Sequence, residues 1–271
     1  MSILLAGFAS RSAATDDDAL YYLAVGGSSS VGFQPTLGAP HGEPTDHGYA
    51  NDLLSLEADR WPRLQLVHTG CPGETTETML QGGDRCYPGQ SSQLEAVVSF
   101  LRDHPTSTAL VTIDIGFNDI SRCLRFEQVD GSCVTEGLDS IEVELPRILG
   151  AIQAVIPPTT ELVGLNHYDP FLAYLRGSAQ ERAFALQSAS TVDQLDDLID
   201  HIYEQHKIAV ADVQHSFSEF NVDPSPAGPG VAQVCALTWM CATQPLGPNP
   251  HPNDAGYRVM ASAIATAINR G

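Results

Sequence analysis

A serine follows two glycines directly after an apolar run near the N-terminus, and its setting could support chemistry. The run Tyr21–Val25 continues into Gly26-Gly27-Ser28, so a sharp turn would present the Ser28 hydroxyl at the end of a strand. Such a turn is more often an ordinary loop, or a nest that cradles phosphate, than the position of a nucleophile. The segment is not a Walker loop, because no Gly-Lys-Ser/Thr follows, and it lacks the second glycine of a Gly-x-Ser-x-Gly elbow.

Three further elements carry polar groups suited to chemistry, and they follow Ser28 in a definite order. Gly70-Cys71-Pro72-Gly73 comes after a second apolar run, and Gly116-Phe117-Asn118-Asp119 comes after a third. His251 stands near the C-terminus in Pro250-His251-Pro252-Asn253. In open α/β sheets ligands bind outside the carboxyl ends of the strands, so these elements are where we look for a site.

Alternating strands and helices are expected to position these elements. Five short apolar, β-branched runs predict strands buried on both faces: Leu20–Val25, Leu64–His68, Thr108–Ile115, Glu161–Asn166 and Lys207–Val213. Amphipathic patterns predict helices at Tyr49–Trp61, Ser91–His104, Ile141–Ile156, Val192–His206 and Asp254–Asn269. The alternation predicts one three-layer α/β/α domain, flavodoxin-like, with a five-stranded parallel sheet over residues 19–271. Residues 1–18 are expected to be a tail or a signal remnant.

Two stretches do not fit the alternation. Cys123–Leu138 is a glycine- and cysteine-bearing insertion, and Gln214–Pro250 is a long connection rich in proline and glycine. Both follow a predicted strand end and both carry a cysteine pair. Segments of this length inside a compact domain are usually functional or stapled loops.

Composition excludes several classes of protein. The 271 residues are 43% apolar, which is enough to bury a core, and 33 Asp+Glu against 13 Lys+Arg leave a formal charge of -20. So negative a field repels phosphate, so we expect no nucleic-acid partner. No apolar run reaches the roughly 18 residues of a transmembrane segment. The cysteine and histidine spacings of common metal sites are missing, so neither a metal nor a cofactor is expected.

Six cysteines form three close pairs in the sequence: Cys71 and Cys86, Cys123 and Cys133, Cys235 and Cys241. Pairing within each would staple three loops, although six cysteines allow 15 connectivities. Disulfides imply an oxidising compartment outside the cytoplasm. Residues 1–14 are similar to the tail of a secretion signal, without its basic region; a mis-set start or a frayed terminus is the alternative.

Taken together and in this order, the four elements resemble the SGNH hydrolase family, also called GDSL esterases and lipases. The resemblance runs from Leu20 to the last helix. Its most specific parts are Gly-x-Asn-Asp and His-Pro-Asn-x-x-Gly-Tyr. The three local cysteine pairs also resemble those of secreted actinobacterial members.

The resemblance implies roles for four residues. It makes Ser28 the nucleophile and His251 the general base, and a neutral imidazole is chemically required to activate a serine hydroxyl. It also implies an oxyanion hole made of the Ser28 and Gly73 backbone N–H groups and the Asn118 amide. Fixed donors of this kind contribute about 10²–10³ in rate each.

The chain departs from the family pattern at two positions. Gly27 replaces an aspartate beside the nucleophile, which puts the rigidity of the turn in doubt. Pro248 stands where the triad acid is normally found, three residues before His251. Its backbone carbonyl can still accept a hydrogen bond from the histidine Nδ1–H, so we expect a Ser–His dyad oriented by Pro248. Other candidates for this orienting role are Asn249, Asp254 and Asp119.

The remaining histidines are expected to be less important. His68 and His167 lie at predicted strand ends and could line the cleft. The others are expected to be solvated: His41, His47, His104, His201, His206 and His215.

The sequence therefore predicts a monomeric serine esterase or lipase, secreted or in the cell envelope, that cleaves small-molecule or lipid esters through an acyl-Ser28 intermediate. A carbohydrate O-acetyl esterase is the alternative within the enzymes. An impaired family member that binds lipid or glycan is the alternative outside them. The segment with Leu237, Trp239 and Met240 is expected either to offer a surface for an acyl chain or simply to plug the end of the sheet.

Overall fold

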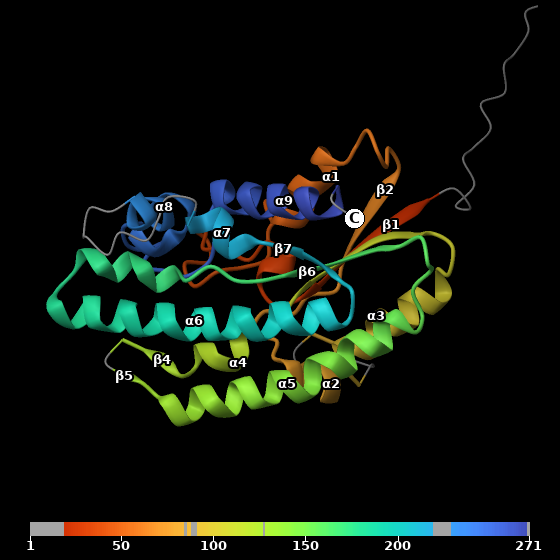
Figure 1. Cartoon of the computed structure of the whole chain (residues 1–271). Helices are drawn as coiled ribbons and strands as arrows, with labels where there is room; N and C mark the ends of the chain where they lie inside the picture. The colour runs from red at the N-terminus through yellow and green to blue at the C-terminus, as the bar shows by residue number, and fades with distance from the viewer. Residues whose placement is uncertain (1–18, 84–85, 88–90, 127, 219–228, 270–271) are drawn as a thin grey trace, which may run out of the picture.

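Five parallel strands form the central sheet, in the order β2-β1-β3-β6-β7 (Figure 1). The computed structural model describes residues 19–83, 86–87, 91–126, 128–218 and 229–269. The strands are β1 (Leu20–Gly26), β2 (Leu64–His68), β3 (Thr108–Asp114), β6 (Glu161–Leu165) and β7 (Ala209–Ala211). The prediction of a five-stranded parallel sheet is confirmed, with each strand within its predicted run or one residue beyond it. The predicted tail, residues 1–18, lies outside the described residues.

The strand order places a crevice beside β1. Tyr22 of β1 is paired with Leu66 of β2 on one side and with Leu110 of β3 on the other. The chain therefore leaves β1 for one edge of the sheet and returns across it to β3, which makes the β1/β3 boundary the topological switch point. Ligands of doubly wound sheets bind at such a point, outside the carboxyl ends of the strands.

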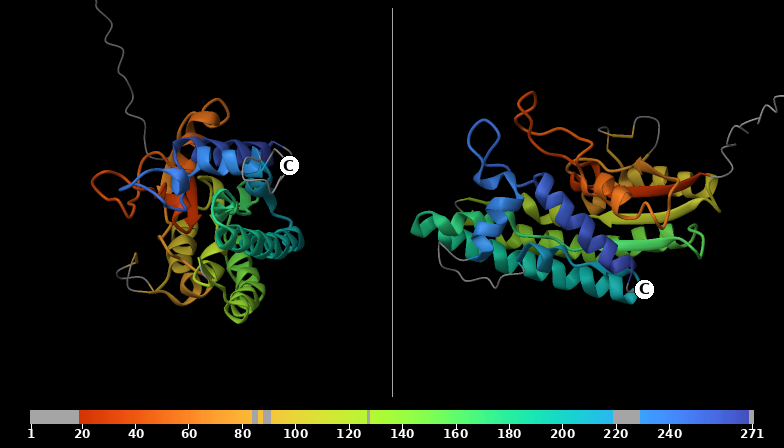
Figure 2. Two further views of the ribbon diagram at one scale, coloured as in Figure 1. Left: turned by 90° about the vertical axis from the view of Figure 1, so that its left-hand side faces the viewer. Right: turned by 90° about the horizontal axis from the view of Figure 1, so that it is seen from above.

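Helices cover both faces of the sheet, as predicted. One face carries α1 (Tyr49–Leu56), α7 (Val213–Ser218) and α9 (Asp254–Ile268); the other carries α3 (Gln93–Asp103), α5 (Gly131–Gln153) and α6 (Ala179–Gln205). Seen end-on (Figure 2, left), α9 lies above the sheet and α5 and α6 lie below it. Successive residues of β1 point to opposite cores, Leu23 to the α3/α5/α6 side and Ala24 to the α1/α9 side.

Short elements connect these layers. They are α2 (Thr76–Gln81), α4 (Phe117–Ser121), α8 (Pro229–Leu237), the hairpin strands β4 (Leu124–Arg125) and β5 (Gln128–Val129), and the 3₁₀ turns Ser29–Val31, Pro170–Arg176 and Trp239–Cys241. No helix among the described residues is long and apolar enough to cross a membrane.

The two longest helices begin well before the positions predicted for them. Helix α5 starts at Gly131 rather than Ile141, because the Asp130 carboxylate accepts from the N–H groups of Ser132 and Cys133 and so caps the helix. Glycines in its first turns hide this start from a propensity argument. Helix α6 starts at Ala179 rather than Val192, behind a capping box of Ser178 and Glu181. The predicted insertion Cys123–Leu138 is thus a small hairpin followed by the first turns of α5.

Three disulfides staple the loops. Cys71–Cys86, Cys123–Cys133 and Cys235–Cys241 are all bonded, which confirms the local pairing. The last of them joins α8 to the Trp239–Cys241 turn. The stretch from Gln214 to Pro250 therefore contains α7, α8 and this turn rather than one open loop, while its residues 219–228 lie outside the described part.

Candidate active site

The turn that carries Ser28 depends on a glycine at the end of β1. Gly26 has φ of 126°, and a Cβ there would lie 1.9 Å from the backbone oxygen of Asp114, so no other residue fits. The Gly27 N–H donates to the same Asp114 oxygen at 2.8 Å. Ser28 then begins the short 3₁₀ turn Ser29–Val31, with its side chain at the sheet crevice.

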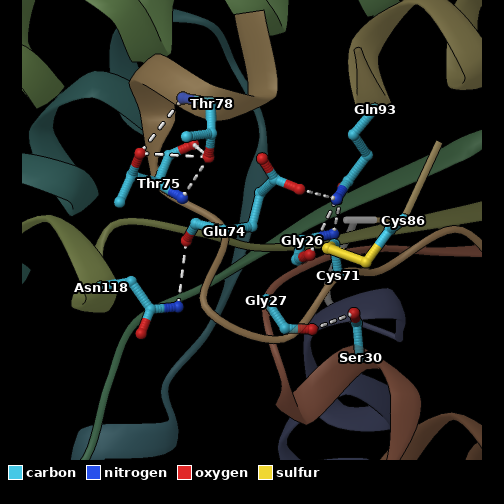
Figure 3. The surroundings of a disulfide bond; sticks show 10 residues. All are labelled: Gly26, Gly27, Ser30, Cys71, Glu74, Thr75, Thr78, Cys86, Gln93 and Asn118. Atoms are coloured by element: carbon cyan, nitrogen blue, oxygen red, sulfur yellow. Dashed lines mark hydrogen bonds between the residues drawn. A yellow bond between two sulfur atoms is a disulfide. The ribbon is translucent and has the colours of Figure 1, made fainter. Parts of the chain in front are cut away.

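Two side chains hold this turn, Gln93 from α3 and Ser30 from the turn itself (Figure 3). The Gln93 amide bonds both backbone groups of Gly26, with Oε1 accepting from N at 2.7 Å and Nε2 donating to O at 3.0 Å. The Ser30 hydroxyl donates to the Gly27 carbonyl at 2.7 Å. A Cβ at position 27 would lie 3.1 Å from Asn118 Nδ2, so the glycine lets that amide approach the turn. Gln93 and Ser30 thus restrain the turn although the aspartate of the family pattern is missing.

His251 faces Ser28 and is oriented by an asparagine. Its Nε2 lies 3.0 Å from Ser28 Oγ, and its Nδ1 lies 2.7 Å from Asn249 Oδ1. The His251 backbone N–H donates to the same Asn249 atom at 3.1 Å, so that atom is an acceptor and Nδ1 must carry a proton. Nε2 is then the bare nitrogen and is free to accept the proton of the serine hydroxyl.

This geometry differs from the expected one, in which the Pro248 carbonyl orients the histidine. Within the described residues His251 bonds Asn249 and not Pro248. The reason is local: an asparagine side chain readily accepts from the backbone N–H two residues on, and this Asx turn carries Oδ1 to the edge of the imidazole.

Neighbouring loops fix the segment around His251. The Tyr168 hydroxyl donates to the Pro250 carbonyl at 2.7 Å, and the backbone of Trp239 pairs with His251 and with Asn249. The Trp239 ring N–H donates to Gln34 Oε1 at 3.1 Å. Trp239 therefore supports the histidine loop, and none of Leu237, Trp239 and Met240 is among the described residues that line the Ser28 pocket.

Burial tunes the charge of His251. It lowers the pKa of the imidazole to about 4, and the Asp114 carboxylate opposes this shift only in part. The ring is packed against Phe33, with the two centroids 4.8 Å apart. At neutral pH the imidazole is therefore uncharged, which is the form that accepts a proton.

Asn118 lies in the same pocket as Ser28 and His251, whereas Gly73 does not. Asn118 Nδ2 donates to the Glu74 carbonyl at 3.0 Å, which leaves the second N–H of the amide for another acceptor. Gly73 precedes Glu74 and lines a separate hollow of about 190 Å³. Within the described residues, the backbone N–H groups of Ser28 and Gly73 donate to no protein acceptor.

The other candidate orienters bind elsewhere. The Asp119 carboxylate accepts from the Thr76 N–H at 3.1 Å and lies 2.7 Å from its hydroxyl, which ties the Asn118 segment to the loop that carries Gly73. Asp254 Oδ1 accepts from Gln34 Nε2. His68 bonds the Ser30 carbonyl through Nδ1, and His167 is the strand-end histidine that lines the pocket.

The pocket beside Ser28 has a volume of about 290 Å³. Apolar side chains form much of its wall: Ile115, Phe117, Tyr168, Pro170 and Phe171. Asp114 and His167 add polar groups. Sequence reasoning did not single out Asp114 or Gln93, since each owes its position to a distant partner.

The fold and the site together define a class of protein. Its members have a doubly wound α/β sheet with a serine and a histidine hydrogen-bonded to each other at the topological switch point. Residues 24–259 match the model of the GDSL-like lipase/acylhydrolase family, and the chain belongs to that family. None of the curated proteins matches it.

Solved structures similar to this chain share its fold. An extracellular lipase from Streptomyces rimosus is 20% identical with a TM-score of 0.60, and the match covers 92% of this chain and 100% of the lipase. An acetylxylan esterase from Geobacillus stearothermophilus is 20% identical with a TM-score of 0.58, covering 92% and 94%. A phospholipase A1 from Streptomyces albidoflavus is 18% identical with a TM-score of 0.57, covering 92% and 99%.

Proposed function

We propose that the protein hydrolyses carboxylic esters through an acyl-Ser28 intermediate, with Ser28 and His251 acting as a dyad. The observation that carries this proposal is the 3.0 Å hydrogen bond between Ser28 Oγ and the bare Nε2 of His251. Membership of the lipase/acylhydrolase family supports an esterase or acylhydrolase.

In the first half of the reaction Ser28 Oγ attacks the ester carbonyl while His251 Nε2 takes its proton. The carbonyl oxygen becomes an oxyanion, stabilised by the free N–H of Asn118 and by the backbone N–H of Ser28. The Gly73 N–H is proposed as the third donor on the family resemblance alone, since Gly73 is not among the residues that line this pocket. Asn249 Oδ1 holds the Nδ1–H of the imidazolium. His251 then gives its proton to the departing alcohol, which leaves an acyl-serine.

In the second half a water molecule attacks the acyl group, and His251 again removes the proton. Collapse of the second tetrahedral intermediate returns the proton to Ser28 and releases the acid. Asn249 contributes a neutral amide where a triad has a carboxylate, so the imidazolium is less stabilised and turnover is expected to be slow.

Two substrate classes fit the proposal. The apolar wall with Phe117 and Phe171 suits an acyl or lipid ester, and a lipase and a phospholipase A1 share the fold. A carbohydrate O-acetyl ester is the alternative substrate, because an acetylxylan esterase has the same fold with a similar TM-score. The hydrogen-bonded, uncharged histidine speaks against a member that only binds its ligand. Three disulfides support a secreted or cell-envelope location, and a monomer remains our prediction.

Replacing Asn118 tests the oxyanion hole. We expect Asn118→Ala to lower kcat by roughly 10²- to 10³-fold with little change in KM, because its amide acts on charge that develops only in the transition state. Asn118→Asp should be at least as slow, since it sets a negative charge against the oxyanion. Steady-state kinetics on a p-nitrophenyl ester measure both, and wild-type turnover by Asn118→Ala would remove Asn118 from the mechanism.

The pH profile tests the state of His251. Because the pKa of the buried imidazole is about 4, kcat/KM should stay high as the pH falls and drop only near pH 4, rather than near 6.5 as for an exposed histidine. Asn249→Asp places a carboxylate at Nδ1, which raises the histidine pKa and should move the acid limb to higher pH. Burial raises the pKa of Asp119 to about 6, but Asp119 is present in both the wild type and Asn249→Asp. It therefore does not explain a difference between their pH profiles. A wild-type limb near pH 6.5 that Asn249→Asp leaves in place would contradict the assignment.

The direct test of the proposed function is hydrolysis of p-nitrophenyl esters from acetate to palmitate, combined with a fluorophosphonate label located by mass spectrometry. A label on Ser28 with turnover supports the esterase, and the dependence on chain length separates an acetyl esterase from a lipase. No label and no turnover by a folded, oxidised sample would exclude it.

A further inference from the structure

A histidine and a carboxylate that the proposed mechanism does not use meet in the pocket beside Ser28. Asp114 ends β3 and His167 follows β6, and these strands are neighbours in the sheet. His167 Nε2 lies 3.6 Å from Asp114 Oδ1, and the two side chains are 8% and 9% exposed. Both residues line the pocket, and the Nε2 atom of His167 is itself buried at its wall.

Asp196 of α6 fixes the orientation of the His167 ring. Its Oδ1 accepts from the His167 backbone N–H at 2.9 Å and lies 3.3 Å from His167 Nδ1, so Nδ1 carries a proton. Burial acts to lower the pKa of His167, but Asp114 and Asp196 outweigh it and raise this pKa to about 9. At neutral pH the ring is therefore an imidazolium, and Nε2 carries a proton as well.

The Nε2–H of His167 has no hydrogen-bond partner among the described residues. Its separation of 3.6 Å from Asp114 is an ion-pair contact that is too long for a hydrogen bond. A buried donor left without an acceptor costs free energy, so a group that supplies the acceptor is bound favourably there.

A hydroxyl group fits this pair of side chains. It can accept from His167 Nε2–H and, at the same time, donate to the Asp114 carboxylate, because a hydroxyl has both a donor and acceptors. A methylene in the same place would leave both charged groups unpaired. The rings of Phe117, which stacks on His167 with centroids 5.8 Å apart, and of Phe171 offer apolar surface to the carbon skeleton beside that hydroxyl.

We propose that Asp114 and His167 form a subsite for a hydroxyl group of the ester, so that hydroxylated esters are hydrolysed in preference to their deoxy counterparts. This inference rests on the proposed function of Ser28. Two carboxyl groups, Asp114 and Asp196, contact the one histidine here, so the subsite does not suit an anion. The hydroxyl belongs either to the acyl part or to the alcohol part of the ester.

Matched ester pairs distinguish these two sources. The acyl arm compares p-nitrophenyl 3-hydroxybutyrate with p-nitrophenyl butyrate, and the alcohol arm compares glyceryl monoacetate with propyl acetate. In one arm the wild-type kcat/KM should favour the hydroxylated ester about 10- to 100-fold, the size of a hydrogen bond to a charged group. The ratio within a pair is the readout, so a general loss of activity in a variant does not imitate the effect.

Variants of the subsite should remove that preference. We expect Asp114→Asn and His167→Gln each to bring the ratio close to one, whereas Ser121→Ala, which alters another polar residue of the pocket lining, keeps the wild-type ratio. Asp114→Asn is isosteric and carries the test if His167→Gln does not fold.

Each outcome bears on a different statement. A wild-type ratio near one in both arms, with turnover of the esters, overturns the subsite and leaves the proposed function intact. A preference that survives in both variants removes Asp114 and His167 from its cause. No turnover of any ester and no fluorophosphonate label overturns the proposed function itself.

Discussion

Ser28→Ala is expected to abolish ester hydrolysis while leaving the protein folded. Without the hydroxyl no acyl-enzyme can form, and loss of a nucleophile of this kind lowers kcat by roughly 10⁴- to 10⁶-fold. The change removes one half-buried oxygen, whose one side-chain partner among the described residues is His251, so no other element depends on it. Turnover of p-nitrophenyl esters and circular dichroism measure the two parts of this expectation.

Ser29→Ala is the matched control for this result. Ser29 is the next residue and also lines the pocket, but its hydroxyl makes no hydrogen bond among the described residues. It should keep its activity within a few-fold and still take up a fluorophosphonate on Ser28. Full activity of Ser28→Ala, or a label on Ser29 instead, would place the nucleophile elsewhere.

His251→Gln should have an effect of similar size. Glutamine is close to histidine in size but cannot take up the serine proton, so we expect a fall in kcat of roughly 10⁴- to 10⁶-fold. Because nucleophile and base act as a unit, the double variant with Ser28→Ala should be no slower than either single one. Kinetics of the three variants on one activated ester give this comparison.

His47→Gln serves as the control, since His47 is exposed and is not among the described residues that line the Ser28 pocket. External imidazole provides an additional test: it should restore part of the activity of His251→Ala, where the ring leaves a space, and none of that of Ser28→Ala. If His251→Gln kept more than about a tenth of wild-type turnover, a different base would be acting.

The positions of the strands along the chain follow from local patterns in the sequence. A short, β-branched run such as Thr108–Ile115, bounded by turn residues, indicates a strand buried on both faces, and β3 is indeed buried at every position. The helix starts at Gly131 and Ala179 were missed because they depend on caps, Asp130 and Ser178, that lie outside the apolar periodicity. The cysteine pairs could be matched because each closes a short loop.

The residues of the site likewise divide into those that local sequence indicates and those that only the folded structure reveals. Gly26 and Ser28 are recognisable because a strand followed by a glycine turn is a local feature, and His251 and Asn118 lie in short motifs. The sequence could not show whether Asn249 or Pro248 orients His251, because both lie within three residues of it. Only the folded Asx turn brings the Asn249 oxygen to Nδ1. Gln93 reaches Gly26 across 67 positions of sequence, and no pattern marks such a contact.

The sequence by itself determined where the strands and helices of the α/β fold lie and at which strand ends polar residues gather, because hydrophobic periodicity and glycine turns are local patterns. It favoured local cysteine pairs but left the other connectivities open. The tertiary structure decided which of the polar residues share a pocket and in what protonation state. Asp114, His167 and Asp196 come from three separate elements, and it is the closeness of the two carboxylates, acting against burial, that makes the ring an imidazolium. Its Nε2–H has no hydrogen-bond partner among the described residues. Charge and hydrogen bonding at that point depend on distances between segments, which a linear sequence does not contain.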